Sequence, residues 1–354
     1  MLILSLTKIK YKNCTVEIES PTLYVDNESR CRSGHMTHAL AEFAPGCFID
    51  FNSNCSALRL DGHMPYGWVE YRIFKDGGKT YSEPRELEYS KRCFLDGIHT
   101  ISVEKAVGCD DGSIVAFCLR NSALDPSFCE PWDTPAVIRS SDGGETWSEP
   151  VECIPYKGRI YDALYYRGVI YVLIFCNEHF LGSSPEHQYR IYKSYDNGIS
   201  FEEASVIPFD TFKRGYGSII FDSSNRLHAY TYIESDESLI DHAVSDDFGL
   251  SWRILELCCV DKGVRNPQTA FIGGVFLLHG RSSTWDGFAL YISDDAASWS
   301  KGTIIAKTDK PAGQYYSNSI SLKDEKGNFL LVQYSESYNG SRVNVKHLKI
   351  RIKK

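Results

Sequence analysis

Short runs of apolar and β-branched residues recur along the chain, and each lies between clusters of Gly, Asn, Asp and Ser. Runs of this length favour strands, because amphipathic helices need a longer stretch with a period near 3.6 residues. Near the C-terminus, charged side chains alternate with Leu348, Ile350 and Ile352, which predicts a final strand. The pattern therefore predicts an all-β protein. Six such runs lie at 47–51, 113–118, 169–175, 226–230, 275–279 and 328–332.

A short motif repeats between these runs. SSDGGETW (140–147) returns as SYDNGISF (194–201) and SDDFGLSW (245–252), with degenerate copies FKDGGKTY (74–81) and SDDAASW (293–299). Asp and Ser side chains accept hydrogen bonds from the N–H groups of a tight turn, and Gly supplies a positive φ. We therefore expect each copy to form a turn between two strands, with a structural aspartate. These aspartates are Asp76, Asp142, Asp196, Asp247 and Asp295.

The motif resembles the Asp box of the sialidase-like β-propellers, and its five copies extend over most of the chain. The resemblance implies a six-bladed β-propeller of four-stranded antiparallel blades. We expect the six apolar runs to be the second strands of these blades. The length agrees, since 354 residues divided among six blades leave about 59 residues for each. We expect one domain over residues 1–354, in which an N-terminal strand at 15–18 pairs beside 343–346 and closes the last blade. Such closure removes exposed sheet edges.

Composition and charge argue against several classes of function. The chain carries 38 basic and 46 acidic side chains, a net charge of −8, and no run of Lys or Arg typical of nucleic-acid binding. No apolar run approaches the roughly 20 residues of a membrane-spanning helix. The twelve cysteines include no CxxC pair, which argues against a zinc ribbon and favours reduced thiols. We expect a cytoplasmic protein, or a secreted one if a leader has been removed, without metal or cofactor.

Propeller geometry indicates where a functional site would form. In an antiparallel blade, the start of the innermost strand and the end of the second strand lie at the same end of the sheet. Six such ends surround one mouth of the central axis, and Tyr216 is among them. The side chains that we predict to contact substrate there are Arg59, Arg120, Arg265, Arg281, Glu336, His35, His38, His63, His99 and Asp96. Such a mouth suits a polar, anionic sugar; the alternative for each residue is an ordinary solvated loop position.

The segment QYYSNSI (314–320), followed by Gly327 and VQYSE (332–336), is similar to the last-blade motif of sialidases. The resemblance implies that Tyr316 is the nucleophile and that Glu336 orients an arginine that binds the substrate carboxylate. It also implies an acid/base aspartate in a first-blade loop, where Asp61 is the match. A phenol suits this chemistry, because a carboxylate nucleophile would be repelled by an acidic sugar. The alternatives are that Tyr316 only opens a strand and that Asp61 caps the turn at Gly62.

The chain departs from the sialidase pattern in two blades. The first blade lacks the Arg-Ile-Pro motif, and the fourth blade lacks the arginine expected at the end of its second strand. Two of the three arginines expected to bind the carboxylate therefore have no match. The fourth blade opens with Tyr216-Gly217-Ser218 where the family has the glutamate that activates the tyrosine. We expect Glu234, near the end of the second strand of that blade, to act as the base instead.

These observations leave three functional hypotheses. The first is an exo-acting glycoside hydrolase that cleaves a terminal acidic sugar from an oligosaccharide or glycoconjugate through Tyr316. The second is a polysaccharide lyase or non-sialic glycosidase that uses tyrosine and the histidines of the first two blades, since histidine can act as a general acid or base. The third is a carbohydrate-binding propeller without catalysis. The oligomeric state stays open.

Overall fold

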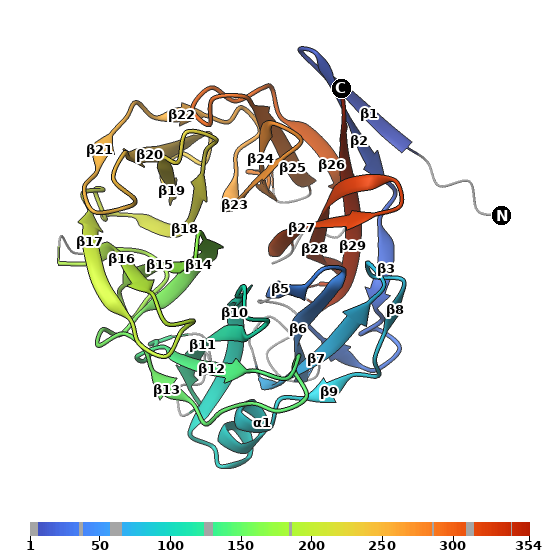
Figure 1. The fold of residues 1–354 in the computed structure, drawn as a ribbon, viewed down its shortest axis with the longest axis vertical. Helices are drawn as coiled ribbons and strands as arrows, with labels where there is room; N and C mark the ends of the chain where they lie inside the picture. The colour runs from blue at the N-terminus through green and yellow to red at the C-terminus, as the bar shows by residue number, and fades with distance from the viewer. Residues whose placement is uncertain are drawn as a thin grey trace.

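The computed structural model of the chain describes residues 6–34, 38–56, 66–123, 130–183, 186–284, 287–308, 315–340 and 342–354. Within these ranges the strands form six antiparallel sheets, arranged as blades around a central axis (Figure 1). The prediction of an all-β, six-bladed propeller is therefore confirmed. A short helix, α1 (Glu88–Leu95), lies on the outside of the ring.

Each sheet supplies one blade. The first contains β4 (Arg32–Ser33), β5 (Leu40–Ala44), β6 (Cys47–Ser56), β7 (Gly67–Lys75), β8 (Thr80–Tyr81) and β9 (Arg85–Glu86). The second contains β10 (His99–Gly108), β11 (Ile114–Ser122), β12 (Ala136–Ser140) and β13 (Val151–Glu152), and the third β14 (Arg159–Tyr166), β15 (Val169–Cys176), β16 (Gln188–Ser194) and β17 (Glu202–Ile207). The fourth contains β18 (Arg214–Phe221), β19 (Leu227–Ile233), β20 (Leu239–Ser245), β21 (Arg253–Ile254) and β22 (Cys258–Cys259), and the fifth β23 (Arg265–Ile272), β24 (Val275–Arg281), β25 (Gly287–Ser293) and β26 (Thr303–Lys307). The sixth contains β27 (Ser317–Asp324), β28 (Gly327–Asn339) and β29 (Arg342–Lys353), together with β1 (Leu6–Tyr11), β2 (Cys14–Glu19) and β3 (Thr22–Val25).

The six apolar runs of the sequence form the second strand of each blade, as predicted. They are β6, β11, β15, β19, β24 and β28, and each pairs with the inner strand on one side and the third strand on the other. Second strands are covered on both faces by neighbouring blades, and β19 and β24 are buried along their whole length. This double burial explains why most residues of the runs are apolar and do not alternate with polar ones.

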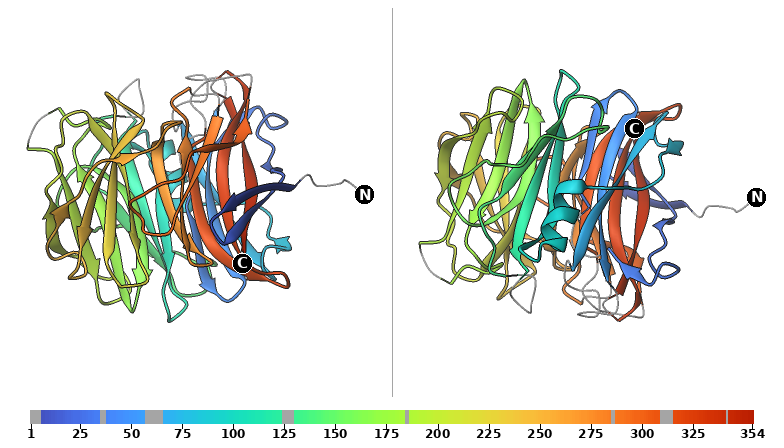
Figure 2. Two further views of the ribbon diagram at one scale, coloured as in Figure 1. Left: turned by 90° about the horizontal axis from the view of Figure 1, so that it is seen from above. Right: turned by 90° about the horizontal axis from the view of Figure 1, so that it is seen from below.

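The N-terminal strands pair with the last blade, but in a register that differs from the prediction. In β2, Thr15 lies opposite Lys353 and Ile18 lies opposite Ile350. The predicted partner of this strand, around 343–346, instead pairs at Val345 with Val25 of β3. The long strand β29 therefore takes β3 along its first half and β2 along its second. The N-terminal segment and the C-terminus consequently lie side by side on the outside of the ring (Figures 1 and 2).

The five Asp-box aspartates lie in turns between the third and fourth strands of blades one to five. Asp142 accepts hydrogen bonds from the backbone N–H of Thr146 (2.9 Å), the Thr146 hydroxyl (2.6 Å) and the Ser140 hydroxyl (2.8 Å). These bonds lower the pKa of Asp142 to about 2. The same side-chain contact recurs from Ser200 to Asp196, from Ser251 to Asp247 and from Thr80 to Asp76. The carboxylates of the box aspartates thus accept hydrogen bonds within their own turns. These turns lie at the end of the blades opposite the predicted site.

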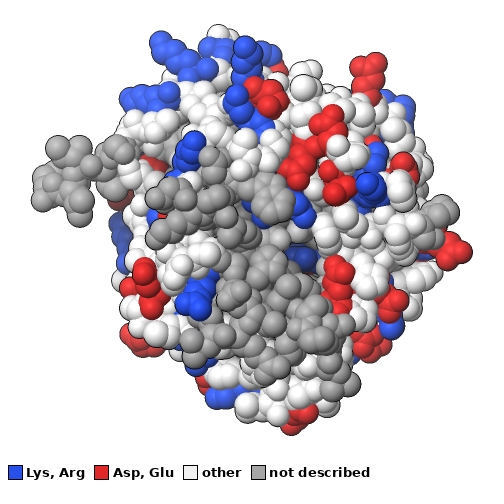
Figure 3. All heavy atoms as spheres, turned by 180° about the vertical axis from the view of Figure 1, so that it is seen from behind, with Lys and Arg blue, Asp and Glu red and all other residues white. Residues whose placement is uncertain are grey.

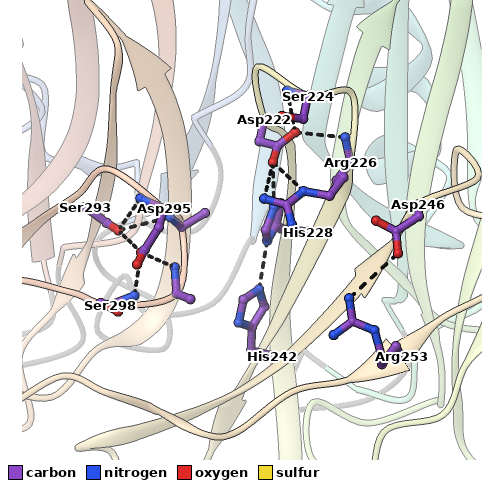
Figure 4. A network of polar contacts seen from close by, with 12 residues as sticks. Asp222, Ser224, Arg226, His228, His242, Asp246, Arg253, Ser293, Asp295 and Ser298 are labelled. Atoms are coloured by element: carbon purple, nitrogen blue, oxygen red, sulfur yellow. Dashed lines mark hydrogen bonds and ion pairs between the residues drawn. The ribbon is translucent and has the colours of Figure 1, made fainter.

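Figure 4 shows the fifth-blade box beside a buried histidine pair. Asp295 accepts bonds from the Ser293 hydroxyl (2.8 Å) and the Ser298 N–H (2.7 Å). Nearby, Nδ1 of His228 lies 2.9 Å from Nε2 of His242. Burial lowers the pKa of both imidazoles, that of His242 to about 3, so both rings are neutral near pH 7. Across the described ranges, no helix is long and apolar enough to span a membrane.

Candidate active site

A bulge in the fourth inner strand directs a tyrosine toward the axis. The register between β18 and β19 shifts between Gly215 and Gly217, so Tyr216 is an extra residue in β18. Tyr216 takes a left-handed φ of 37°, a conformation that re-aims its side chain relative to its strand neighbours. A similar shift occurs in β14 at Tyr161. Both bulges lie near the start of their strands, at the mouth where the sequence predicted the site.

The last blade brings a second tyrosine to the same point. The Tyr315 N–H donates to the Ser335 carbonyl (2.8 Å), and the Ser335 N–H donates to the Tyr316 carbonyl (3.0 Å), so both tyrosines oppose one residue. The two rings consequently part. Tyr315 stacks on Phe288 in the core between blades five and six, with ring centres 5.5 Å apart. The Tyr316 hydroxyl lies 3.0 Å from the Tyr216 hydroxyl.

Three arginines surround this tyrosine pair. The guanidinium carbon of Arg281 lies 5.8 Å from the centre of the Tyr316 ring, and that of Arg159 lies 5.8 Å from the centre of the Tyr216 ring. Arg265 is the third. Burial alone would lower the pKa of Arg265, but the nearby Tyr216 and Tyr316 hydroxyls contribute to a net increase. Figure 3, which views this mouth, shows basic side chains near the centre of the face, with acidic side chains beside them. The mouth is therefore suited to an anionic group.

Arg159 is held by a buried carboxylate on the second inner strand. Its Nε and Nη2 atoms lie 2.8 and 2.7 Å from Oε2 of Glu104, and the two side chains are only 4% and 7% exposed. The rings of Trp132 and Tyr161 pack against the guanidinium, with centres 5.4 and 5.2 Å away. Burial raises the pKa of Glu104, while the charge of Arg159 partly offsets that rise. The pair fixes the arginine's orientation next to Tyr216.

Arg265 also faces a glutamate. Its Nη1 lies 3.6 Å from Oε1 of Glu237, which accepts a hydrogen bond from the Tyr232 hydroxyl at 3.0 Å. The rings of Tyr232 and Phe180 lie 5.4 and 5.3 Å from the guanidinium carbon. Two of the three arginines at this mouth are thus oriented by carboxylates and aromatic rings from neighbouring loops and strands.

Arg120, predicted to bind substrate, is engaged within its own blade. Its Nε donates to the Thr134 carbonyl (2.5 Å), and its Nη2 lies 2.7 Å from Oε1 of Glu152 on the outermost strand β13. The guanidinium therefore points across the blade toward its outer edge. The position of Arg120 near the end of an apolar strand does not predict this orientation, because a side chain there can point either toward the axis or toward the outer edge of the blade.

Two predicted carboxylates also have other partners. Glu336 pairs with Lys346 on the adjoining strand β29. Glu234 is 38% exposed and lies 3.6 Å from the ammonium of Lys213. The hydroxyl next to the phenol of Tyr316 is instead that of Tyr216. The expectation that Glu234 acts as the base on Tyr316 thus has no support in these contacts.

His38, His99 and Asp96, which were predicted to contact substrate, each make contacts within the fold. His38 is buried, with Nδ1 3.2 Å from Oδ1 of Asn52. Nε2 of His99 lies 3.4 Å from Oδ2 of Asp133, and burial lowers the pKa of His99. Asp96 follows the last residue of α1 and closes that helix through its backbone N–H. Four further predicted residues lie outside the described ranges, namely Asp61, Arg59, His35 and His63.

Sequence inspection missed Arg159, Glu104 and Glu237. Two signals were available. Glu104 and Lys105 are adjacent charges in the middle of the largely buried strand β10, and Arg159 opens β14 directly after Gly158. A charge in the middle of a buried strand must be paired, which marks it for inspection. Among the described residues, no group of three or more His, Cys, Asp or Glu side chains is arranged to hold a metal ion.

Comparison with known proteins identifies relatives by structure only. No protein-family model and no curated protein sequence matches the chain. A crystal structure of a protein of unknown function from Dyadobacter fermentans is 17% identical and covers 96% of this chain and 99% of its own, with a TM-score of 0.74.

Sialidases share the same architecture. A mutant of NanB sialidase from Streptococcus pneumoniae is 11% identical, with a TM-score of 0.68, over 94% of this chain and 70% of its own. Trypanosoma rangeli sialidase, in a covalent intermediate with 2,3-difluorosialic acid, is 12% identical, with a TM-score of 0.62, over 97% of this chain and 58% of its own. The chain therefore has the six-bladed β-propeller fold of the sialidases, at a sequence identity that establishes the fold alone.

Proposed function

We propose that the protein is an exo-acting glycoside hydrolase that removes a terminal acidic sugar from an oligosaccharide or glycoconjugate, with Tyr316 as the nucleophile. One observation carries the proposal: the Tyr316 phenol contacts Tyr216 at the mouth of the axis, with Arg281 over its ring. The sialidase-like fold supports it. A phenol surrounded by arginines suits a substrate that brings its own negative charge.

In this proposal, Arg281 and Arg265 bind the sugar carboxylate, and Arg159 adds positive charge to the same mouth. The Tyr316 oxygen attacks the anomeric carbon, the bond to the leaving group breaks, and the leaving oxygen takes a proton from an acid. The Tyr316 proton passes by way of the Tyr216 hydroxyl to solvent. Asp61 is the proposed acid, on the sequence resemblance alone. Water then cleaves the glycosyl–tyrosine bond.

One observation favours a second candidate, a polysaccharide lyase. Opposite Tyr316 stands a phenol, Tyr216, where the sialidase pattern has a carboxylate base, and burial raises the pKa of Tyr216. Two tyrosines and an arginine are enough for β-elimination. The arginine neutralises a uronate carboxylate, one tyrosine in its phenolate form removes the adjacent proton, and the other, in its neutral form as the raised pKa favours for Tyr216, protonates the leaving oxygen. The product would be an unsaturated uronate.

The two candidates differ in their products. The full chain is incubated with fluorogenic acidic and neutral glycosides and, separately, with uronate-containing polysaccharides monitored by ultraviolet absorbance. Fluorophore release from acidic glycosides alone supports the hydrolase, and a rise in absorbance from polysaccharide supports the lyase. Sugar binding without either product would contradict both and favour a binding protein.

Tyr316→Phe tests the nucleophile directly, because it removes one oxygen and keeps the ring. Turnover of the best substrate should fall by about 1,000-fold or more, at about 1.4 kcal/mol of transition-state stabilisation for each tenfold loss. Tyr315→Phe is the matched control, since that ring packs in the core, and it should retain turnover within about tenfold. Equal activity in both variants would refute the tyrosine mechanism.

A further inference from the structure

A cavity opens at the end of the axis opposite the tyrosine pair, on the Asp-box face that Figure 1 views. Its outer part has a volume of about 410 Å³, and it continues inward to a chamber of about 200 Å³. All six inner strands contribute to its wall, through Leu40, Ala106, Leu164, Ile220, Phe271 and Ile320. A cavity of this size falls in the range of small-molecule binding sites.

The outer part of this cavity is mainly apolar and aromatic, and Glu42 is the charged residue in its described lining. Tyr166 stacks on Phe221 with ring centres 4.0 Å apart, and Tyr165 and Phe271 lie beside them in the wall. Phe271 is 36% exposed. An exposed aromatic rim around a concave opening favours a ligand with an apolar body.

The floor of the cavity is polar but electrically balanced. The Lys105 ammonium lies 3.1 Å from Oδ1 of Asp162 and donates to the side-chain oxygens of Gln268 (2.5 Å) and Asn318. Asp162 also accepts hydrogen bonds from Ser218 and from a backbone N–H. The three N–H groups of Lys105 are thus engaged, whereas an amide oxygen has two lone pairs and can accept a second donor. The floor is therefore suited to a hydroxyl donor without net charge.

We propose that this cavity binds a small uncharged amphiphile, with a hydroxyl-bearing head on the Lys105–Asp162 floor and an apolar body against Phe221 and Phe271. A charged head would lose its hydration at a floor that offers no uncompensated counter-charge. The proposal does not depend on the proposed hydrolase, because the cavity lies at the opposite mouth. Ser218, two residues after Tyr216, belongs to the layer that separates the two.

Isothermal titration of the full chain with hexyl β-D-glucoside, below its micelle concentration, tests the proposal. Glucose and 1-hexanol serve as half-probes that carry only the head or only the tail. Saturable binding of the glucoside, at least tenfold tighter than either half-probe, is expected. Absence of saturable binding, or equal affinity for 1-hexanol, would overturn the proposal.

Three variants locate the site. Phe271→Asp places a charge in the apolar rim, and Ser321→Trp fills the opening; each should weaken binding at least tenfold. Ile304→Asp is the control, because Ile304 is 37% exposed in the same blade but outside the cavity lining. Arg281→Met, at the opposite mouth, should leave glucoside affinity unchanged. If Arg281→Met abolishes binding, or if both cavity variants bind like the unmodified chain, the assignment is wrong.

Discussion

The contact between Tyr216 and Tyr316 is the central interaction of the candidate active site at the scale of single residues. Tyr216→Phe keeps the ring and removes the hydroxyl that lies 3.0 Å from the Tyr316 oxygen. A hydrogen bond to an oxygen that becomes charged contributes about 1.5–3 kcal/mol, so kcat/KM should fall by roughly 10- to 100-fold. Steady-state kinetics on the substrate found in the panel measures this loss.

The control for Tyr216 is Tyr161→Phe in the neighbouring inner strand. The Tyr161 hydroxyl lies 3.5 Å from the Phe180 carbonyl and its ring packs against Arg159. This variant should keep kcat/KM within about threefold, because that hydrogen bond is long and does not involve Tyr316. Equal losses in the two variants would show that the Tyr216 hydroxyl has no special role.

The Glu104–Arg159 pair makes a prediction about stability. Glu104→Gln leaves Arg159 buried without its counter-charge, which should lower the free energy of unfolding by about 3–5 kcal/mol. The double variant Glu104→Leu with Arg159→Met removes both charges and should regain most of that loss. Urea denaturation of the single and double variants measures both values. A double variant less stable than Glu104→Gln would contradict the assignment of a buried ion pair.

At the scale of elements, the bulge in β18 directs Tyr216 toward the axis, and the absence of a side chain at Gly217 leaves room for the bulge. A Cβ atom at Gly217 would lie 2.8 Å from Cδ2 of Leu173 and 3.2 Å from the Tyr230 carbonyl oxygen. Gly217→Ala should therefore shift the strand, lower the free energy of unfolding by about 1–3 kcal/mol and reduce kcat/KM at least tenfold. Thermal denaturation and kinetics are measured on the same preparation.

Gly168→Ala is the matched comparison, in the turn between β14 and β15. Gly168 has a φ of 82°, so alanine is strained there by about 1 kcal/mol, but no described atom lies within 4 Å of the added Cβ. This variant should lose stability without losing activity. A similar loss of activity in both would mean that Gly217 acts only through overall stability.

At the scale of the whole molecule, buried neutral histidines couple the fold to pH. His279 lies between blades five and six, within 3.1 Å of the Ser317 and Ser319 hydroxyls, and burial lowers its pKa to about 3. In the unfolded chain its pKa returns to about 6.5, so unfolding in acid takes up a proton. The contribution of His279 to the free energy of unfolding is therefore constant above pH 6.5. As the pH falls from 6.5 toward 3, this contribution lowers the free energy of unfolding progressively.

His279→Gln removes that proton uptake while keeping a side chain that can bond both serines. Between pH 6 and pH 4, the slope of unfolding free energy against pH should be shallower in the variant by about 1.4 kcal/mol per unit. Denaturation curves at a series of pH values measure the difference. Parallel slopes for the variant and the unmodified chain would show that His279 is not the buried neutral group described here.

The sequence by itself determined the turns and the second strands of the blades, and the resemblance that the turns carry implied their number. The Asp boxes depend on local contacts, because the hydrogen bonds of Asp142 involve residues within four positions along the chain. A segment of eight residues is therefore enough to specify the turn. The second strands can also be recognised in the sequence, because burial on both faces selects mostly apolar residues. The prediction that Tyr316 belongs to the site also rests on a contiguous motif.

Only the tertiary structure decided which polar groups meet at the mouth. Glu104 pairs with Arg159 across 55 positions and Tyr216 meets Tyr316 across 100, so no local pattern links them. Glu336 and Arg120 lie at strand positions where the sequence predicted contact with substrate or with a substrate-binding arginine. In the structure, residues of neighbouring strands, Lys346 and Glu152, are their partners. The physical reason is that turn and strand patterns depend on contacts within a few residues, whereas a propeller mouth is assembled from six strand ends whose bulges set where each side chain points.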